Sequence, residues 1–422
     1  MREDIKERIE MINKGKMPEG YKKTKLGVIP EAWKLMKIKD CLERVDNPVE
    51  VEPDEKYTQI GIRSHGKGLF YKEAVIGRDL GNKRVFWIEP DRFIVNIVFA
   101  WEQAVGRTTQ YESGMIASHR FPMYKPVKNR VAIDYLVQYF LTQKGNEVME
   151  YASPGGAGRN KTLGQERFMK SYIVCPSCSE QDKIVEIIKK WSELTSLQEK
   201  LIEEKRNEKK WFMQNLLTGK LRLPGFDNQW KKTRIGDFIT EVSEKTTTNY
   251  EYEILSVTKN GIFKQSDQFN KQIASEDNIG YKILRKGNLV FSTMNLWMGS
   301  LDVLEQFDIG IVSPAYKIFE FNNELMLPCF GKYYMRSSYM IWRYNINSEQ
   351  GASVVRKNLD LDSLLDTHVK IPNINEQKAI AQILSKADRE IELLEKQLEL
   401  FKLEKKAIMQ LLLTGIVRVN EN

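Results

Sequence analysis

The sequence predicts an α/β (α+β) protein with two similar globular heads, each built on a twisted sheet. Two long antiparallel coiled-coil helices join the heads in a pseudo-twofold arrangement. The first observation is a repeat, because Glu208–Leu223 (EKKWFMQNLLTGKLRL) returns as Glu404–Val419 (EKKAIMQLLLTGIVRV) after 196 positions. The second is that each copy ends a long helical pattern, which itself follows a segment rich in β-branched and aromatic runs. A duplicated chain suits a target that is itself in two parts.

Composition limits the classes of protein that fit. The chain has 422 residues, of which 41% are hydrophobic and 29% charged, which indicates two to four globular domains. No apolar run is long enough to span a membrane, and the charged N-terminus lacks the apolar core of a secretory signal. Four irregularly spaced cysteines suit a reducing compartment, so we expect a cytoplasmic protein. A net charge of +8 favours a polyanionic partner, although only moderately.

The first half begins with an N-terminal helical extension, residues 1–20, in which Asp4–Asn13 has isoleucines on one side. Residues 21–178 form the first predicted head. Short β-branched and aromatic runs there alternate with Gly, Pro and Asn, and one helix is expected over Ala132–Glu150.

The second head is predicted over residues 221–375, and it repeats the first. Gly68-Leu69-Phe70 is answered by Gly261-Ile262-Phe263, and Trp101 by Trp297. We expect strands and a helix over Ile254–Val257, Asn288–Thr293, Ala315–Phe321 and Leu327–Met340. The heads share apolar positions but differ elsewhere, whereas the helices match closely.

The conserved helical regions are predicted over residues 179–220 and 376–422. In the second, apolar residues alternate by four and three for more than four heptads, and the stretch from Ile380 to Leu412 spans roughly 48 Å. In the first copy this apolar heptad seam is interrupted by Thr195 and Gln198. An adjacent apolar stripe is formed there by Leu194, Leu197 and Leu201. Each helix ends at Thr-Gly, a common C-terminal cap.

Because two helices with an apolar heptad seam lie in one chain, we expect them to pair with each other. The alternative is a coiled coil between separate chains, and both remain open at this point.

Catalytic signatures are missing from the sequence. It contains no phosphate loop, no H-E-x-x-H and no G-x-S-x-G motif, and its three histidines lie in unrelated contexts. Cys175 and Cys178 have zinc or redox spacing, but the repeat places Ile371 and Ile374 at the same positions. We therefore expect structural cysteines, no metal site, no bound cofactor and no catalytic residue.

Polar clusters suited to DNA lie in the heads. Arg and Lys can bind guanine or phosphate, and Asn and Gln can pair with adenine. For any single residue a solvated loop is the better interpretation, whereas contact gains support for the loops GGAGRNK and GASVVRKN, which recur before each helix. The candidate DNA-binding residues are Arg63, Lys67, Arg107, Gln110, Arg159, Asn160, Lys161, Lys259, Asn260, Lys282, Arg285, Lys286, Arg356, Lys357 and Asn358.

The chain resembles the specificity subunit of type I restriction-modification systems. The resemblance rests on the IPEAW entry at Trp33, on Pro-x-x-x-Glu-Gln at Pro176–Gln181 and Pro372–Gln377, and on the two MQ(N/L)LLTG endings. No single motif is diagnostic, but their order and duplication are specific and cover nearly the whole chain.

The resemblance implies two target-recognition domains, each reading one half of a bipartite double-stranded DNA site. It also implies that the coiled coil sets the half-site spacing and docks two methyltransferase subunits, which restriction (motor-nuclease) subunits then join. S-adenosylmethionine and ATP would be bound by those partners, and this chain would be non-catalytic. The alternatives are a coiled-coil scaffold or adaptor without DNA readout, which salt-sensitive DNA affinity would exclude, and a fused methyltransferase, which the missing cofactor motifs oppose.

Overall fold

The computed structural model describes residues 3–81, 84–156, 161–268, 277–353 and 356–419. The chain divides into two compact units, which are described separately below. Unit 1 comprises Met1–Leu197 with Leu398–Asn422, and unit 2 comprises Gln198–Gln397. Each unit therefore contains one head together with part of both long helices, whereas the sequence prediction drew its boundaries between heads and helices.

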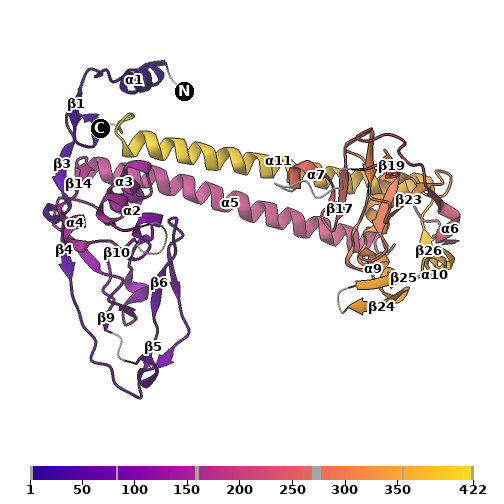
Figure 1. Ribbon diagram of the computed structural model, residues 1–422, viewed down its shortest axis with the longest axis horizontal. Helices are drawn as coiled ribbons and strands as arrows, with labels where there is room; N and C mark the ends of the chain where they lie inside the picture. Colours follow the sequence, from indigo (N-terminus) through magenta and orange to yellow (C-terminus); the bar gives the residue numbers. More distant parts are fainter. Residues whose placement is uncertain (1–2, 82–83, 157–160, 269–276, 354–355, 420–422) are drawn as a thin grey trace. The chain divides into compact units, whose positions relative to one another are not determined.

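Unit 1 is built around a four-stranded antiparallel sheet of order β11-β10-β13-β4. Smaller antiparallel pairs surround it, and one of them, β3–β14, leads into the long helix α5 (Figure 1). The strands are β1 (Tyr21–Thr24), β2 (Gly27–Pro30), β3 (Lys34–Lys37), β4 (Leu42–Val45), β5 (Lys56–Tyr57), β6 (Ile60–Ile62), β7 (Leu69–Tyr71), β8 (Val75–Ile76), β9 (Val85–Trp87), β10 (Phe93–Val95), β11 (Val105–Arg107), β12 (Ile116–Ser118), β13 (Met123–Pro126) and β14 (Tyr172–Cys175).

The helices between β13 and β14 contribute buried side chains to the core around this sheet, whereas the N-terminal helix has no buried residue. Helix α1 (Glu3–Asn13) forms where the sequence predicts it, and α4 (Gln165–Lys170) precedes β14. The single helix expected over Ala132–Glu150 is two helices, α2 (Ile133–Phe140) and α3 (Gln143–Ala152). Thr142 separates them because its hydroxyl accepts a hydrogen bond from the Gly145 amide and caps α3.

Unit 2 repeats this architecture. Its main sheet has the order β16-β23-β20-β21, again wholly antiparallel, and the β15–β26 pair matches β3–β14. The strands are β15 (Lys231–Arg234), β16 (Ile239–Val242), β17 (Leu255–Thr258), β18 (Gly261–Lys264), β19 (Lys282–Arg285), β20 (Leu289–Ser292), β21 (Leu301–Val303), β22 (Ile309–Val312), β23 (Tyr316–Phe321), β24 (Ser348–Ser353), β25 (Arg356–Leu359) and β26 (His368–Ile371).

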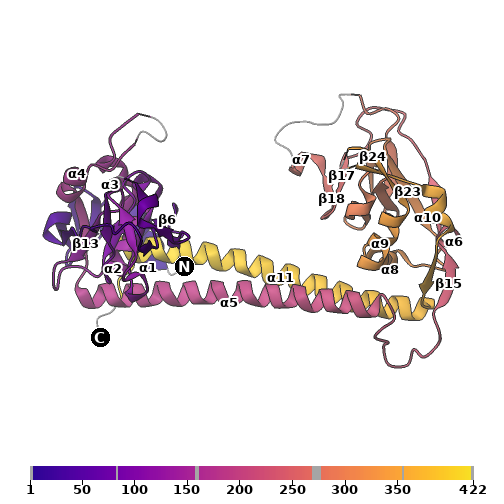
Figure 2. The same cartoon turned by 90° about the horizontal axis from the view of Figure 1, so that it is seen from below.

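In unit 2, as in unit 1, two helices form where the sequence predicted one. The helix expected over Leu327–Met340 is split into α8 (Pro328–Met335) and α9 (Ser338–Ile346), which lie side by side in Figure 2. Ser337 caps α9 through its hydroxyl, at the position that Thr142 holds in unit 1. The short helices are α6 (Ile235–Phe238), α7 (Gln265–Gln268) and α10 (Leu361–Asp366).

The long helices α5 (Cys178–Leu216) and α11 (Ile374–Leu413) run antiparallel within each unit (Figures 1 and 2). In unit 1 the rings of Trp191 and Phe401 pack edge to face, with centroids 6.2 Å apart. In unit 2 the Lys205 ammonium lies 3.1 Å from a Glu390 carboxylate oxygen. The pairing within the chain that the heptad seam favours is therefore present.

Gln198 shows how the seam continues where its apolar pattern stops. The side chain is buried and donates to the Leu394 carbonyl at 3.0 Å and to Gln397 Oε1 at 3.3 Å. The neighbouring stripe of Leu194, Leu197 and Leu201 is left exposed. A buried polar side chain with satisfied hydrogen bonds thus takes a seam position, and leucines remain on the surface. None of the helices in the described part of the chain has the length and hydropathy that crossing a bilayer requires.

Candidate nucleic-acid interface

The β6–β7 hairpin of unit 1 carries two of the candidate residues, Arg63 and Lys67, on its exposed turn. The turn is fastened to the adjoining segment by three hydrogen bonds. Ser64 Oγ donates to Glu102 Oε2 at 2.8 Å, and the amides of residues 65 and 66 donate to the carbonyls of residues 102 and 103. The Arg63 guanidinium lies over the ring of Phe70, 5.3 Å from its centroid. A basic turn is therefore held in a fixed place on the head.

Beside this turn lies the 3₁₀-helix η3 (Ala100–Glu102), which presents the indole of Trp101. The indole N–H donates to the Val98 carbonyl at 3.2 Å, and the Lys161 ammonium sits 5.1 Å from the ring centroid. A cation held over an aromatic face is stabilised by the ring quadrupole. Two candidates from the same loop, Arg159 and Asn160, lie outside the described residues.

The β17–β18 hairpin is the counterpart in unit 2, and its turn exposes Lys259 and Asn260. Arg336 fixes this turn by donating to the Lys259 carbonyl at 3.0 Å while pairing with the buried Asp302 carboxylate at 3.2 Å. Burial raises the pKa of Asp302, although Arg336 opposes the shift. Gly261 has φ +121°, and a Cβ there would meet Asp302 at 2.9 Å, so only glycine fits.

The tryptophan and lysine of unit 1 recur in unit 2. The 3₁₀-helix η6 (Leu296–Met298) presents Trp297, and the Lys357 ammonium lies 5.1 Å from its centroid. Trp101 and Trp297 are 196 positions apart, as are Lys161 and Lys357. Lys357 also donates to Asn345 Oδ1 at 2.5 Å, and Asn358 is exposed. The side chain of Arg356 lies outside the described set.

The remaining candidate DNA-binding residues lie outside the two basic turns and the two tryptophan sites. Arg107 pairs with Asp91 and Asp134 at 2.6 and 2.8 Å, and its neighbour Gln110 is exposed on η4 (Gln110–Glu112). Arg285 pairs with Glu244 at 2.8 Å, and Lys286 with Asp308 at 3.2 Å.

Lys282 is buried and donates to the Tyr316 carbonyl at 2.7 Å, and burial lowers its pKa. The structure thus gives this ammonium a partner inside the head. The structure therefore places Arg63, Lys67 and Lys161 on the basic turn and at the tryptophan of unit 1, and Lys259, Asn260 and Lys357 at the corresponding features of unit 2.

The duplicated Glu-Gln motif has a role that the sequence alone did not reveal. Glu180 Oε2 accepts from the Trp33 indole at 2.9 Å, and both of its oxygens accept from Arg418. In unit 2, Glu376 accepts from Trp230 at 3.2 Å and from Arg222 in the same way.

The glutamines beside them join the long helices to the heads. Gln181 Oε1 accepts from the Ala132 amide at 2.8 Å, and Gln377 Oε1 accepts from the Leu327 amide at 2.9 Å. These motif residues therefore fix the start of each long helix against its own head.

Comparison with known proteins agrees with this architecture. Residues 227–402 match the family model described as type I restriction modification DNA specificity domain. Two relatives from Methanocaldococcus jannaschii match almost end to end. The putative type I restriction enzyme MjaX specificity subunit is 25% identical, over 95% of this chain and 97% of the relative. The type I restriction enzyme MjaVIII specificity subunit is 23% identical, over 93% and 94%.

Solved structures share the fold. The HsdS subunit from Thermoanaerobacter tengcongensis superposes with a TM-score of 0.55 at 14% identity, covering 92% of this chain and 98% of that one. A chain from a structural study of assembly and conformational transition in the type I R-M system gives a TM-score of 0.60 at 14% identity, covering 92% and 99%.

These features, together with the family match, define a protein with a type I restriction modification DNA specificity domain over residues 227–402. Over nearly its whole length, this chain is similar to the specificity subunits of type I restriction enzymes.

Proposed function

We propose that this chain is the non-catalytic, DNA-reading subunit of a type I restriction-modification complex, in which each head reads one half of a bipartite site. The observation that carries the proposal is the duplicated platform, Lys161 over Trp101 in unit 1 and Lys357 over Trp297 in unit 2. Each platform accompanies an exposed basic turn, with Lys67 or Lys259. Lysines held in fixed positions suit phosphate contacts, which set the register of a protein on the duplex.

The two heads differ around this shared platform. The unit 1 turn carries Arg63 and Lys67, whereas the unit 2 turn carries Lys259 and Asn260. Arg and Lys favour guanine, and Asn favours adenine. Equivalent backbone contacts combined with different base-reading side chains are what recognition of two dissimilar half-sites requires. The helices α5 and α11 then set the spacing between the half-sites.

The same helices supply a surface for partner subunits. Besides the stripe on α5, helix α11 exposes Leu393, Leu400 and Leu403. Exposed apolar residues repeated along a helix suit packing against other helices. We assign this surface to two methyltransferase subunits, which bring S-adenosylmethionine, and restriction subunits that bring ATP complete the complex.

The test is to co-express the chain with the methyltransferase subunit encoded beside it and to map methylated adenines in the host genome. A split motif with a fixed gap is expected, and exchanging residues 231–371 for those of another specificity subunit should change one half only. Methylation at a continuous site, or none from an intact complex, would contradict the proposal.

A further inference from the structure

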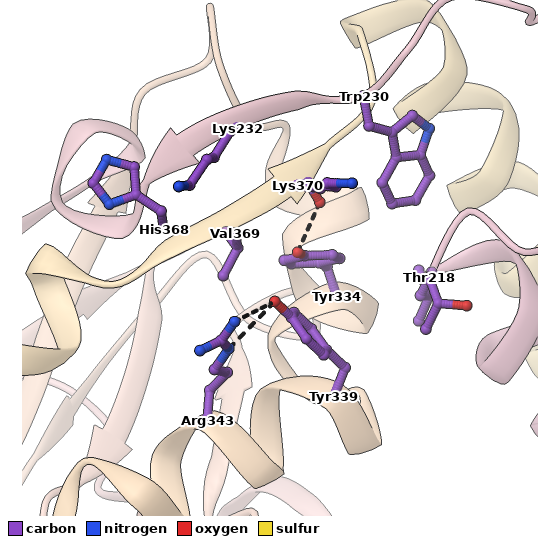
Figure 3. A pocket seen from close by; sticks show the side chains of 10 residues that line it. Thr218, Trp230, Lys232, Tyr334, Tyr339, Arg343, His368, Val369 and Lys370 are labelled. Carbon is purple, nitrogen blue, oxygen red and sulfur yellow. Dashed lines mark hydrogen bonds between the residues drawn. The ribbon is translucent and has the colours of Figure 1, made fainter.

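A cavity of about 260 Å³ opens in unit 2 between α9, the β15–β26 pair and the C-terminal end of α5 (Figure 3). We call it the basic pocket. The side chains that give it its character are two lysines, an arginine, a histidine and two aromatic residues: Lys232, Lys370, Arg343, His368, Trp230 and Tyr339. None of these is a candidate DNA-binding residue, and the proposed interface does not use the pocket.

The pocket has an excess of positive charge. Lys232 and Lys370 are directly opposite one another in the register of β15 and β26, an arrangement that is destabilising for like charges. Within the described parts of the chain, neither ammonium has a carboxylate within ion-pair distance. The same holds for Arg343, whose guanidinium bonds the Tyr339 hydroxyl at 3.1 Å and stacks on Trp342, 4.9 Å from the ring centroid. An anionic group would relieve this repulsion.

In the corresponding place of unit 1, the β1–β2 hairpin forms part of the wall of a cavity. The β1–β2 hairpin places Lys25 over the ring of Tyr172, 4.9 Å from its centroid, and packs Leu26 against the core. Its Gly27 turn approaches Lys144, whose Nζ lies 3.6 Å from where a Cβ would stand.

The unit 1 residues that make these contacts have equivalents that line the basic pocket in unit 2. Tyr172 begins β14 as His368 begins β26. Lys144 is the second residue after the cap of α3, as Tyr339 is after the cap of α9. In unit 2 the chain from residue 223 to 229 forms no hairpin, and none of these residues lines the basic pocket.

Charge distinguishes the two places. In unit 1 the hairpin brings Lys25 to a cavity that Glu147 also lines. In unit 2 the residue equivalent to Glu147 is Trp342, and cations line the pocket. An occupant of the basic pocket should therefore carry the opposite charge to the hairpin, with an apolar residue in the place of Leu26.

We propose that the basic pocket binds an extended acidic segment of a partner subunit, in the place that the β1–β2 hairpin takes in unit 1. The rim supports a protein occupant, because Trp342 and Ile346 are each 53% exposed, and Trp, Tyr and Arg dominate the energetics of protein interfaces. DNA is disfavoured, since the two heads would be expected to use equivalent surfaces for it and the hairpin occupies this one in unit 1. The identity of the partner, a methyltransferase subunit, rests on the function proposed above.

The experiment uses the full chain co-purified with the methyltransferase subunit encoded beside it. A photoreactive benzoylphenylalanine replaces Trp342, and the matched control carries it at Glu147. Irradiation of the assembled complex should join position 342, but not 147, to an Asp- and Glu-rich peptide of the partner. Reversing charge with K232E and K370E together should reduce the cross-linked product by about tenfold or more, and K231E on the same strand should not.

Size-exclusion chromatography of the co-purified proteins distinguishes failure of the docking proposal from failure of the proposed function. A complex that assembles but gives no partner cross-link at position 342 overturns the docking proposal alone. A cross-link to added duplex DNA instead would make the pocket a nucleic-acid site and also overturn it. If no complex forms at all, the proposed function fails and the docking proposal fails with it.

Discussion

Arg418 holds the carboxylate of Glu180, with Nε 2.7 Å from Oε1 and a terminal nitrogen 2.8 Å from Oε2. The arginine follows the end of α11, and the glutamate lies in the first turn of α5, so this pair joins the two helices within unit 1. Arg222 and Glu376 repeat the pair in unit 2, at 2.7 and 2.9 Å. In each unit, an arginine in the segment after one long helix binds a glutamate in the first turn of the other.

Replacing Arg418 by alanine should destabilise unit 1. The Glu180 side chain is only 1% exposed, so removal of Arg418 leaves a buried charge that keeps the Trp33 hydrogen bond but loses both bonds to the guanidinium. Loss of one partner from such a pair costs about 3–5 kcal/mol. We expect a lower thermal midpoint, with faster hydrogen exchange at the start of α5.

R222A provides the matched variant, because it should raise exchange at the start of α11 instead. Equal exchange at both sites in either variant would mean that the pair does not act locally within its unit.

This pair also marks a limit of reading the sequence alone. The heptad seam and the Thr-Gly endings predict α5 and α11, since periodicity and caps are local signals. Glu180 and Arg418 stand 238 positions apart, and nothing local joins them. The Glu-Gln motif was visible as a repeat, but its partners became known only from the fold.

The heads show a second limit. A single helix was predicted across Thr142 and another across Ser337, because apolar residues continue on both sides of each break. The signal that could have corrected this is the capping residue itself, which ends one helix pattern and starts the next. For the proposed interface, the sequence named basic residues that the structure places on two hairpin turns and over two tryptophan rings, and their contact with DNA stays a prediction. It did not predict that those lysines would lie over the rings of Trp101 and Trp297, because contacts between residues distant in the sequence leave no local pattern.

Removing the platform lysines should weaken DNA binding equally at all sequences. A lysine that contacts phosphate contributes to the salt dependence of affinity, with a slope of about 0.9 per contact. K161A and K357A should each lower the slope of log affinity against log salt by about that amount. Titration of a specific and an unrelated duplex with the assembled complex over a range of salt concentrations measures this.

The control is K286A, whose ammonium pairs with Asp308 in the structure and should leave the slope unchanged. A change of the methylated motif in K161A, at constant slope, would mean that this lysine reads a base.

Acid should release the ion pairs around Asp134. Burial raises the pKa of this carboxyl, but hydrogen bonds from Lys189 and Arg107, both at 2.8 Å, outweigh it and leave the pKa below its ordinary value. A carboxyl with a depressed folded pKa stabilises the fold above its unfolded pKa of about 3.9, and this contribution is lost as pH falls through the folded pKa.

D134N should therefore be less stable than the parent near neutrality, with a difference that shrinks as the pH drops below about 4. Hydrogen exchange of α2 at several pH values provides the measurement. A difference that stays constant across this range would show that the ion pairs contribute nothing, and that the substitution acts through packing.

The exposed leucines of α11 should matter for assembly and not for folding. Leu400 and Leu403 are 59% and 64% exposed, so aspartate at both positions removes little apolar burial within the chain. Because the same leucines are proposed to pack against a methyltransferase subunit, L400D/L403D should reduce co-purification of that subunit by about tenfold or more, since each buried Leu contributes roughly 1.5–3 kcal/mol. The neighbouring E404Q is the control for a change of charge on this face. Equal loss of thermal stability and of assembly would instead assign these leucines to the fold, and normal assembly of the double variant would place the docking surface elsewhere.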